Sequence, residues 1–119
     1  MRVEQSSGNQ EAQQQGWQQA DTNRVRLRAT LVSREILRYS PGGVPILNAT
    51  LSHESRQPEG GGARQLQFDL SVLFAGPAAL LADRLVLGAA LDLTGFLAPR
   101  RRQSKQLVLH VNEFELIEV

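Results

Sequence analysis

The segment from Gln65 to Phe74 alternates between polar and apolar side chains, and this alternation constrains the fold more than any other feature of the chain. A period of two is typical of a β-strand that buries one face. The expected inward residues are Leu66, Phe68, Leu70, Val72 and Phe74, and the expected outward residues are Gln65, Gln67, Asp69 and Ser71. For this reason we expect Phe68 and Phe74 in the core, together with Phe114 of a later strand.

The same period occurs in two earlier segments. Val25, Leu27, Ala29 and Leu31 alternate with polar residues from Arg24 onward, and Leu47, Ala49 and Leu51 do so after residue 46. Between these two segments, Ser40-Pro41-Gly42-Gly43 predicts a turn, because proline fixes φ and glycine accepts a positive φ. Residues 57–63, with three consecutive glycines, predict a flexible loop between the second and third strands.

A short helix is predicted after the third strand. Gly76-Pro77 ends that strand and suits a helix start, since proline is favoured at the first helical position. The Ala- and Leu-rich residues that follow are good helix formers, and the helix is expected to end near Gly88.

Two further strands follow the helix. Leu91 and Leu93 predict a fourth strand that runs to Phe96, and residues 99–105 form a basic loop. In the last strand the apolar residues Leu107, Leu109 and Val111 alternate, whereas Phe114 and Leu116 have the opposite parity. This change of parity predicts a β-bulge or a strand that leaves the barrel.

Composition excludes several function classes. The chain has 119 residues, enough for one domain, and no cysteine, which excludes a disulfide scaffold, a thiolate zinc site and a cysteine nucleophile. It has no glycine-rich phosphate loop, nucleophile motif or ligand-spaced metal cluster, so we expect no enzyme, no cofactor and no small-molecule substrate. His53 and His110 are interpreted as structural residues of strands and not as catalytic groups.

The termini and the cellular location are predicted from apolar content. Residues 1–22 are rich in Gln, Ser and Asn, with Trp17 as the only large apolar group after the start, so we expect a disordered tail before a domain at 23–119. Trp17 is either a short recognition anchor or a residue without a role. The uncharged run at 71–82 is shorter than the ~20 residues of a membrane span, and no secretory signal is visible, so we expect a cytoplasmic protein without membrane contact.

Three strands, a helix and two strands make the order of an OB-fold. We therefore predict an all-β protein, a five-stranded Greek-key barrel with one short helix between strands 3 and 4. Such barrels bind oligonucleotides or oligosaccharides across the middle strands and the loops after strands 1 and 4. The basic loop at 99–105 falls in the second of these loops, where it is suited to phosphate contacts.

Several short sequence segments resemble those of a known family. They are Thr22-Asn23-Arg24-Val25, Ser40-Pro41-Gly42-Gly43-Val44-Pro45, Ser104-Lys105 before Val108-Leu109-His110, and Glu115-Leu116-Ile117. Over about residues 22–119 the chain resembles the primosomal replication protein N (PriB) family, small dimeric relatives of bacterial single-stranded-DNA-binding protein. The resemblance implies a cytoplasmic homodimer that binds single-stranded DNA and bridges the restart helicase to later primosome proteins. In such a dimer, His110 and, similarly, His53 are interpreted as strand residues packed at the dimer seam.

The resemblance and the basic residues together give a set of predicted DNA contacts. Arg38, Arg101 and Lys105 fall at basic positions of the family, Arg64 with Gln65 matches an Arg-Gln pair that opens strand 3, and the others lie nearby. The complete set is Arg26, Arg28, Arg34, Arg38, Tyr39, Arg64, Gln67, Arg100, Arg101, Arg102 and Lys105. Arg26 and Arg28 serve either as phosphate contacts or as the polar face of a strand.

Two departures from the family pattern affect the prediction. Gln67 stands where well-known members have a tryptophan, and Glu54 stands where a basic residue is common. Because base stacking on an aromatic is worth ~1–3 kcal/mol, we expect DNA binding that depends mainly on the loops or is weak. Tyr39 is the aromatic nearest the first turn that can substitute. The alternative is an adaptor that binds primosome proteins with little DNA affinity.

Overall fold

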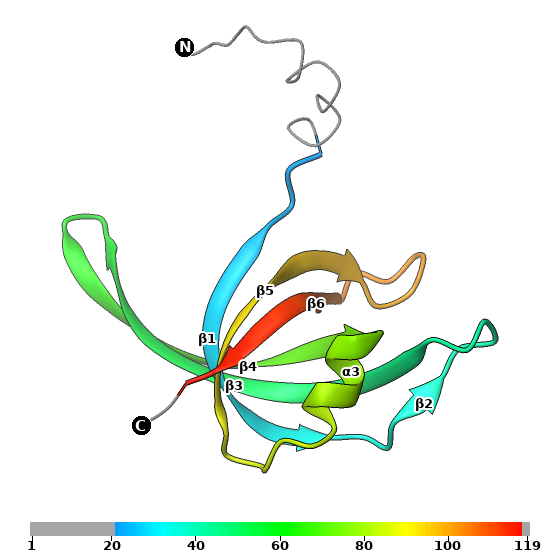
Figure 1. The fold of residues 1–119 in the computed structure, drawn as a ribbon. Coiled ribbons are helices and arrows are strands. Elements are labelled where there is room, and N and C mark those ends of the chain that lie inside the picture. Colours follow the sequence, from blue (N-terminus) through cyan, green and yellow to red (C-terminus); the bar gives the residue numbers. More distant parts are fainter. Residues whose placement is uncertain (1–20, 118–119) are drawn as a thin grey trace, which may run out of the picture.

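The computed structural model describes residues 21–117. Their six strands form a single sheet that curls into a barrel, and one short helix packs against it (Figure 1). The elements are β1 (Val25–Arg34), β2 (Arg38–Tyr39), β3 (Pro45–Glu59), β4 (Gly62–Ala75), α3 (Pro77–Ala82), β5 (Ala90–Pro99) and β6 (Leu107–Leu116). The sheet order is β1-β5-β6-β4-β3-β2, and an additional pairing of β1 with β3 closes the five long strands. The predicted OB-fold is confirmed, with β2 as a short additional strand.

Barrel closure depends on β1 having two partners. Residues 25–30 of β1 pair with β5, and residues 30–34 pair with β3. A register shift between Leu31 and Ser33 allows the strand to bend from one partner to the other. On the opposite side, β4 and β6 run parallel from Val72 to Phe74.

The core is aliphatic with one aromatic contact. Phe74 is fully buried and packs against Phe114 in a T-shaped (edge-to-face) arrangement, with ring centroids 5.4 Å apart. The buried alternating residues are Ala29, Leu31, Leu47, Ala49, Leu51, Val72, Leu91, Leu93, Leu109 and Val111, which confirms the period-two predictions. Helix α3 starts at Pro77 as predicted, and its alanines at 78, 79 and 82 are buried in this core.

The flexible loop predicted at 57–63 is wrong. β3 and β4 remain paired to Glu59 and Gly62, so only Gly60 and Gly61 form the turn, and their φ angles of 61° and 88° fit a tight hairpin turn of type I′. Residues 53–68, here named the hairpin arm, project from the barrel (Figure 1). Phe68 lies on this arm and is 40% exposed, so its predicted place in the core is wrong as well.

The helix ends at Ala82 and not near Gly88 as predicted. The segment that follows makes backbone hydrogen bonds with β1: the Gly88 amide donates to the Leu31 carbonyl at 2.7 Å, and the Leu31 amide donates to the Ala89 carbonyl at 2.9 Å. These bonds hold the segment at residues 83–89 against β1, so it does not continue the helix.

The predicted bulge in the last strand is confirmed. Thr94 pairs with Glu113 and Gly95 pairs with Val111, so Asn112 is left over between them. A Cβ atom on Gly95 would lie 2.0 Å from the His110 carbonyl oxygen, so β5 and β6 approach each other here more closely than any other residue allows. The bulge turns Phe114 toward Phe74, whereas Leu107, at the start of the strand, is 51% exposed.

Asn23 and Ile117 attach the two ends of the described chain to the barrel. The Asn23 side chain donates to the Leu97 carbonyl at 2.8 Å and accepts from the Leu97 amide at 3.0 Å. The Ile117 amide donates to the Ala90 carbonyl at 2.8 Å. Apart from residues 21 and 22, the segment predicted to be disordered lies outside the described residues, and so does Trp17. Within residues 21–117, no helix has the length and apolar character needed to cross a membrane.

Candidate functional site

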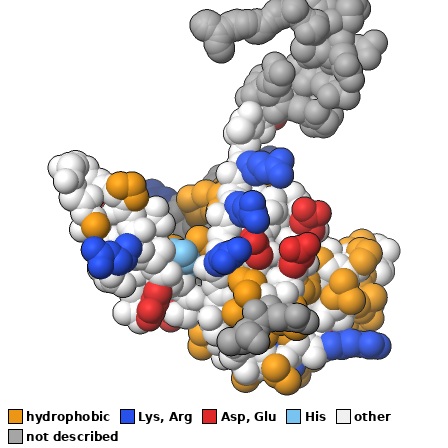
Figure 2. Space-filling view, turned by 60° about the vertical axis from the view of Figure 1, so that its left-hand side comes forward, with side chains coloured by type: hydrophobic (Ala, Val, Ile, Leu, Met, Phe, Trp, Pro, Cys, Tyr) orange, Lys and Arg blue, Asp and Glu red, His pale blue; other side chains and the backbone are white. Residues whose placement is uncertain are grey.

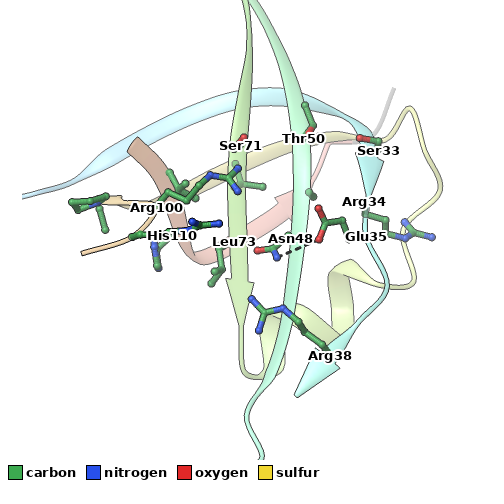
Figure 3. A pocket seen from close by; sticks show the side chains of 16 residues that line it. Ser33, Arg34, Glu35, Arg38, Asn48, Thr50, Ser71, Leu73, Arg100 and His110 are labelled. Carbon is green, nitrogen blue, oxygen red and sulfur yellow. Dashed lines mark hydrogen bonds between the residues drawn. The ribbon is translucent and has the colours of Figure 1, made fainter. Parts of the chain in front are cut away.

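A groove of about 410 Å³ runs over the outer face of the barrel (Figure 3). Its floor consists of outward side chains from five strands (β1, β3, β4, β5 and β6) and the segment after β1, arranged in two rows that cross the strands. One row is Ser33, Thr50, Ser71, Val108 and Ala98, and the other is Glu35, Asn48, Leu73 and His110. These positions have the opposite parity to the core residues, so the alternation that fills the core also builds the groove.

Three arginines flank this floor. Arg38 comes from β2, and Arg100 and Arg101 come from the loop between β5 and β6. Figure 3 shows Arg100 and His110 on one side of the groove and Glu35 and Arg38 on the other, with Asn48 between them. The carboxylate of Glu35 accepts a hydrogen bond from Asn48 at 3.5 Å. The groove therefore combines cations at its edges with a mainly neutral floor, which suits a chain of phosphates.

Backbone hydrogen bonds shape the basic loop. The Arg100 amide donates to the Gln106 carbonyl at 2.8 Å, and the Ser104 amide donates to the Arg101 carbonyl at 2.9 Å. The Ser104 hydroxyl accepts from the Gln106 amide at 3.0 Å. Arg102 and Lys105 lie on the same loop, exposed and outside the groove lining.

Arg34 lines the groove with its stem, but its guanidinium points away from it (Figure 3). The guanidinium donates to the Leu85 carbonyl and lies 4.0 Å from the Asp83 carboxylate. These two contacts hold the segment after α3 against β1. Arg34 is therefore less available to a phosphate than Arg38.

Arg26 and Arg28 lie outside the groove lining, beside an acidic side chain. Figure 2 shows a face of the molecule on which basic and acidic side chains adjoin. Asp92 of β5 is 2.9 Å from the Arg26 guanidinium and 3.6 Å from that of Arg28. The hydrogen bond from Arg26 holds the pKa of Asp92 below its ordinary value, although desolvation acts in the opposite direction. The same hydrogen bond raises the pKa of Arg26. Asp92 thus neutralises part of the positive charge of this strand.

The remaining predicted contacts lie away from the groove lining. Arg64 is on the hairpin arm, 3.1 Å from Glu59, and Gln67 pairs across the arm with Glu54. Tyr39 follows Arg38 in β2 and is 60% exposed. The structure therefore divides the predicted set: Arg34, Arg38, Arg100 and Arg101 line one groove, whereas the others lie in the outer loop, on the arm, beside Asp92 or, for Tyr39, in β2 outside the groove lining.

Sequence reasoning missed the neutral floor of the groove. Asn48, Thr50 and Ser71 alternate with buried residues, so their outward parity was a usable signal. Glu35 gave no such signal, because it follows the bend in β1. Among the described residues, no group of three or more His, Cys, Asp or Glu side chains is arranged to hold a metal ion.

Comparisons with known proteins point to one group. Residues 23–113 match the model of a family described as "another single-strand binding protein family". The chain is 35% identical over 95 residues to replication restart protein PriB from Nitrosomonas europaea, covering 80% of this chain and 88% of that protein. The PriB of Bordetella pertussis is 34% identical over 91 residues, covering 76% and 85% of the two chains.

Solved structures agree with these matches. PriB from Ralstonia solanacearum superimposes with a TM-score of 0.75 and 44% identity, covering 82% of this chain and 99% of that chain. The single-stranded DNA binding protein from Thermus aquaticus superimposes with a TM-score of 0.65 and 25% identity, covering 82% of this chain and 50% of that chain.

Proposed function

The chain belongs to the PriB family of replication restart proteins, within the wider family of single-strand binding proteins, and on this basis we propose that it binds single-stranded DNA as an accessory protein of the replication-restart primosome. The observation that carries the proposal is the groove flanked by Arg38, Arg100 and Arg101. It lies across the middle strands and beside the loop between the last two strands, where OB-folds bind oligonucleotides.

The mechanism is electrostatic. Arginines at the edges of the groove neutralise phosphates and release counterions, which gives affinity without sequence preference. On the hairpin arm, Gln67 offers no aromatic ring and Glu54 adds a negative charge opposite it. Binding therefore depends mainly on Arg100, Arg101 and the rest of their loop.

The family resemblance supports three finer proposals. The chain acts in the cytoplasm as a homodimer, so that two grooves serve one DNA strand. It binds the restart helicase and later primosome proteins and brings them together on the DNA. It carries out no catalysis of its own, and the proteins that it recruits supply that activity.

A second candidate function is an adaptor that binds primosome proteins with little affinity for DNA. The observation that favours it is a set of exposed apolar side chains on α3 and the segment after it: Leu81 is 62% exposed, Val86 75% and Leu87 59%. Exposed apolar surface of this kind is typical of protein contacts. Gln67 and Glu54 on the arm favour the same function.

Fluorescence anisotropy of a labelled thymidine oligomer across several salt concentrations distinguishes the two functions. About four phosphate contacts per protomer predict a slope near −3 for log affinity against log salt, and Arg101→Ala and Lys105→Ala are each expected to reduce its magnitude by about 0.7. Arg84→Ala is the matched control, because it removes the same charge from an exposed position after α3. No binding at low salt would refute the DNA-binding proposal and favour the adaptor.

A further inference from the structure

A row of side chains crosses four strands at the groove and changes character along its length. Phe96 of β5 pairs with His110 of β6, His110 pairs with Leu73 of β4, and Leu73 pairs with Asn48 of β3. The row is aromatic and apolar at the β5–β6 end and polar at the β3 end. Nucleobases present flat apolar faces, and the first part of this row is the part that fits them.

The two rings at that end form a stacked pair. The centroids of Phe96 and His110 are 5.0 Å apart and their planes are inclined by 21°. His110 is half-buried and lines the groove, whereas Phe96 is 37% exposed and lies against His110 without being part of the groove lining. Because Phe96 packs on the imidazole, the ring is held in one orientation before a base arrives, which reduces the entropy lost on binding.

The backbone fixes the place of this pair. A side chain at Gly95 would meet the His110 carbonyl, so β5 and β6 are in close contact beside the two rings. Figure 3 shows Arg100 on the same side of the groove as His110. A phosphate held by Arg100 is therefore next to a surface that can receive a base.

The chain also contains a second aromatic–histidine pair, which differs in its setting. His53 and Phe68 are 4.9 Å apart, with planes inclined by 37°. His53 is buried, its Nδ1 donates to the Arg28 carbonyl at 2.7 Å, and its Nε2 is hydrogen-bonded to the Ser55 hydroxyl at 2.8 Å. Neither ring lines the groove. This pair lies at the base of the hairpin arm, outside the groove lining, and therefore provides a matched control.

We propose that Phe96 and His110 form the base-stacking position of the groove, the place where a nucleobase of a bound single strand lies against an aromatic surface beside Arg100. This inference rests on the proposed DNA-binding function and adds a second kind of contact to it. It assigns His110 to the DNA surface and replaces the interpretation of that residue as part of a dimer seam. It also supplies the aromatic contact that Gln67 does not provide on the arm.

The test is the same anisotropy titration with Phe96→Leu and His110→Leu, and with Phe68→Leu as control. Loss of one stacking contact predicts about 5- to 150-fold weaker binding for the first two variants. Their salt slope is expected to stay unchanged, since neither residue contacts a phosphate. Phe68→Leu is expected to bind within about twofold of the unmodified protein, by the same stacking argument.

Two further variants exclude a folding defect. His110→Tyr keeps an aromatic ring and is expected to recover most of the affinity lost in His110→Leu. Phe96→Trp, made together with Trp17→Phe, places the only tryptophan against His110 beside the groove, where stacked bases are expected to quench its fluorescence.

The outcomes separate this inference from the proposed function. If the unmodified protein shows no binding at low salt, the proposed function fails and this inference fails with it. If the unmodified protein binds but Phe96→Leu and His110→Leu keep full affinity, the DNA-binding function stands and the stacking position is wrong. A reduced salt slope in these variants would also overturn it, because the two residues would then act through phosphate contacts.

Discussion

Gly95 shows how one residue without a side chain sets the distance between two strands. A Cβ atom there would lie 2.0 Å from the His110 carbonyl oxygen, 2.9 Å from its carbon and 3.0 Å from the Val111 Cα. All three are backbone atoms, so no side-chain rotation relieves the clash.

Gly95→Ala is therefore expected to lower the free energy of unfolding by about 1–3 kcal/mol or more, the range for overpacked sites. Chemical denaturation measures the change. Gly42→Ala is the control, because its new methyl group would meet nothing closer than the Ser40 hydroxyl at 3.9 Å. Equal stability of the two variants would show that β5 and β6 separate easily.

Asp92 makes stability depend on pH. Its pKa is held below the ordinary value of about 3.9, chiefly by the hydrogen bond from Arg26. A carboxyl group with a lowered pKa in the folded state stabilises the fold fully above its unfolded pKa. This contribution is lost as the pH falls through the folded value.

When the pH is lowered from about 5 to about 2, the melting temperature of Asp92→Asn is therefore expected to fall less than that of the unmodified protein. Thermal unfolding across that range measures the difference. Asp69→Asn, an exposed carboxylate on β4, is the control and is expected to follow the unmodified protein. Parallel curves for all three proteins would contradict the role given to the pair with Arg26.

Among the elements, the hairpin arm is the most independent of the core. Its strands pair only with each other, and its turn requires positive φ angles of 61° and 88° at Gly60 and Gly61. A β-branched residue is strained there, and the left-handed conformation costs about 1–2 kcal/mol.

Gly61→Val is expected to open the tip of the arm without unfolding the barrel. Hydrogen exchange should become faster at the amides of Glu59 and Arg64, while exchange in β5 and β6 stays unchanged. Gly62→Val is the control, because residue 62 has no positive φ. Global destabilisation by Gly61→Val would mean that the arm and the barrel unfold as one unit.

Local pattern predicted most elements, and long-range contacts account for the failures. The alternation at Leu47 to Leu51 and the parity change at Phe114 gave correct strands and a correct bulge. The glycines at 60 and 61 suggested flexibility by composition, although two glycines in that position also favour a type I′ turn. The end of α3 was missed because residues 83–89 bond to β1, which no local pattern reveals.

The candidate site was predicted in part for a similar reason. The basic loop with Arg100 and Arg101 was identified from charge and from its place in the strand order. The pairing of Arg26 with Asp92 depends on the register between β1 and β5, so the sequence alone left its role open.

At the scale of the whole molecule, one core supports both the barrel and the groove. Phe74 is fully buried and in contact with Phe114, on the two strands of the parallel pair β4–β6. Outward residues of the same strands form the floor of the groove. A substitution that destabilises the core is therefore expected to disrupt the groove as well.

Phe74→Ala is expected to cost about 3–5 kcal/mol, a large part of the about 5–15 kcal/mol that stabilises a domain. Circular dichroism should show a lower melting temperature, and DNA binding should be lost at the same temperature. Phe68→Ala on the arm is the control and should melt close to the unmodified protein. Binding that persists above the melting transition would contradict a shared core.

The double hydrogen bond of Asn23 has a practical consequence for protein engineering. Its side-chain amide donates to and accepts from the Leu97 backbone, as a paired residue of a neighbouring strand would. This one residue therefore holds the chain before β1 against β5, three residues before Arg100. We expect a charged tag fused directly ahead of Asn23 to affect DNA binding, because Leu97 lies only three residues before Arg100 along the chain. The described chain ends at the side of the barrel opposite the basic loop (Figure 1), so a label at that end is expected to disturb binding less.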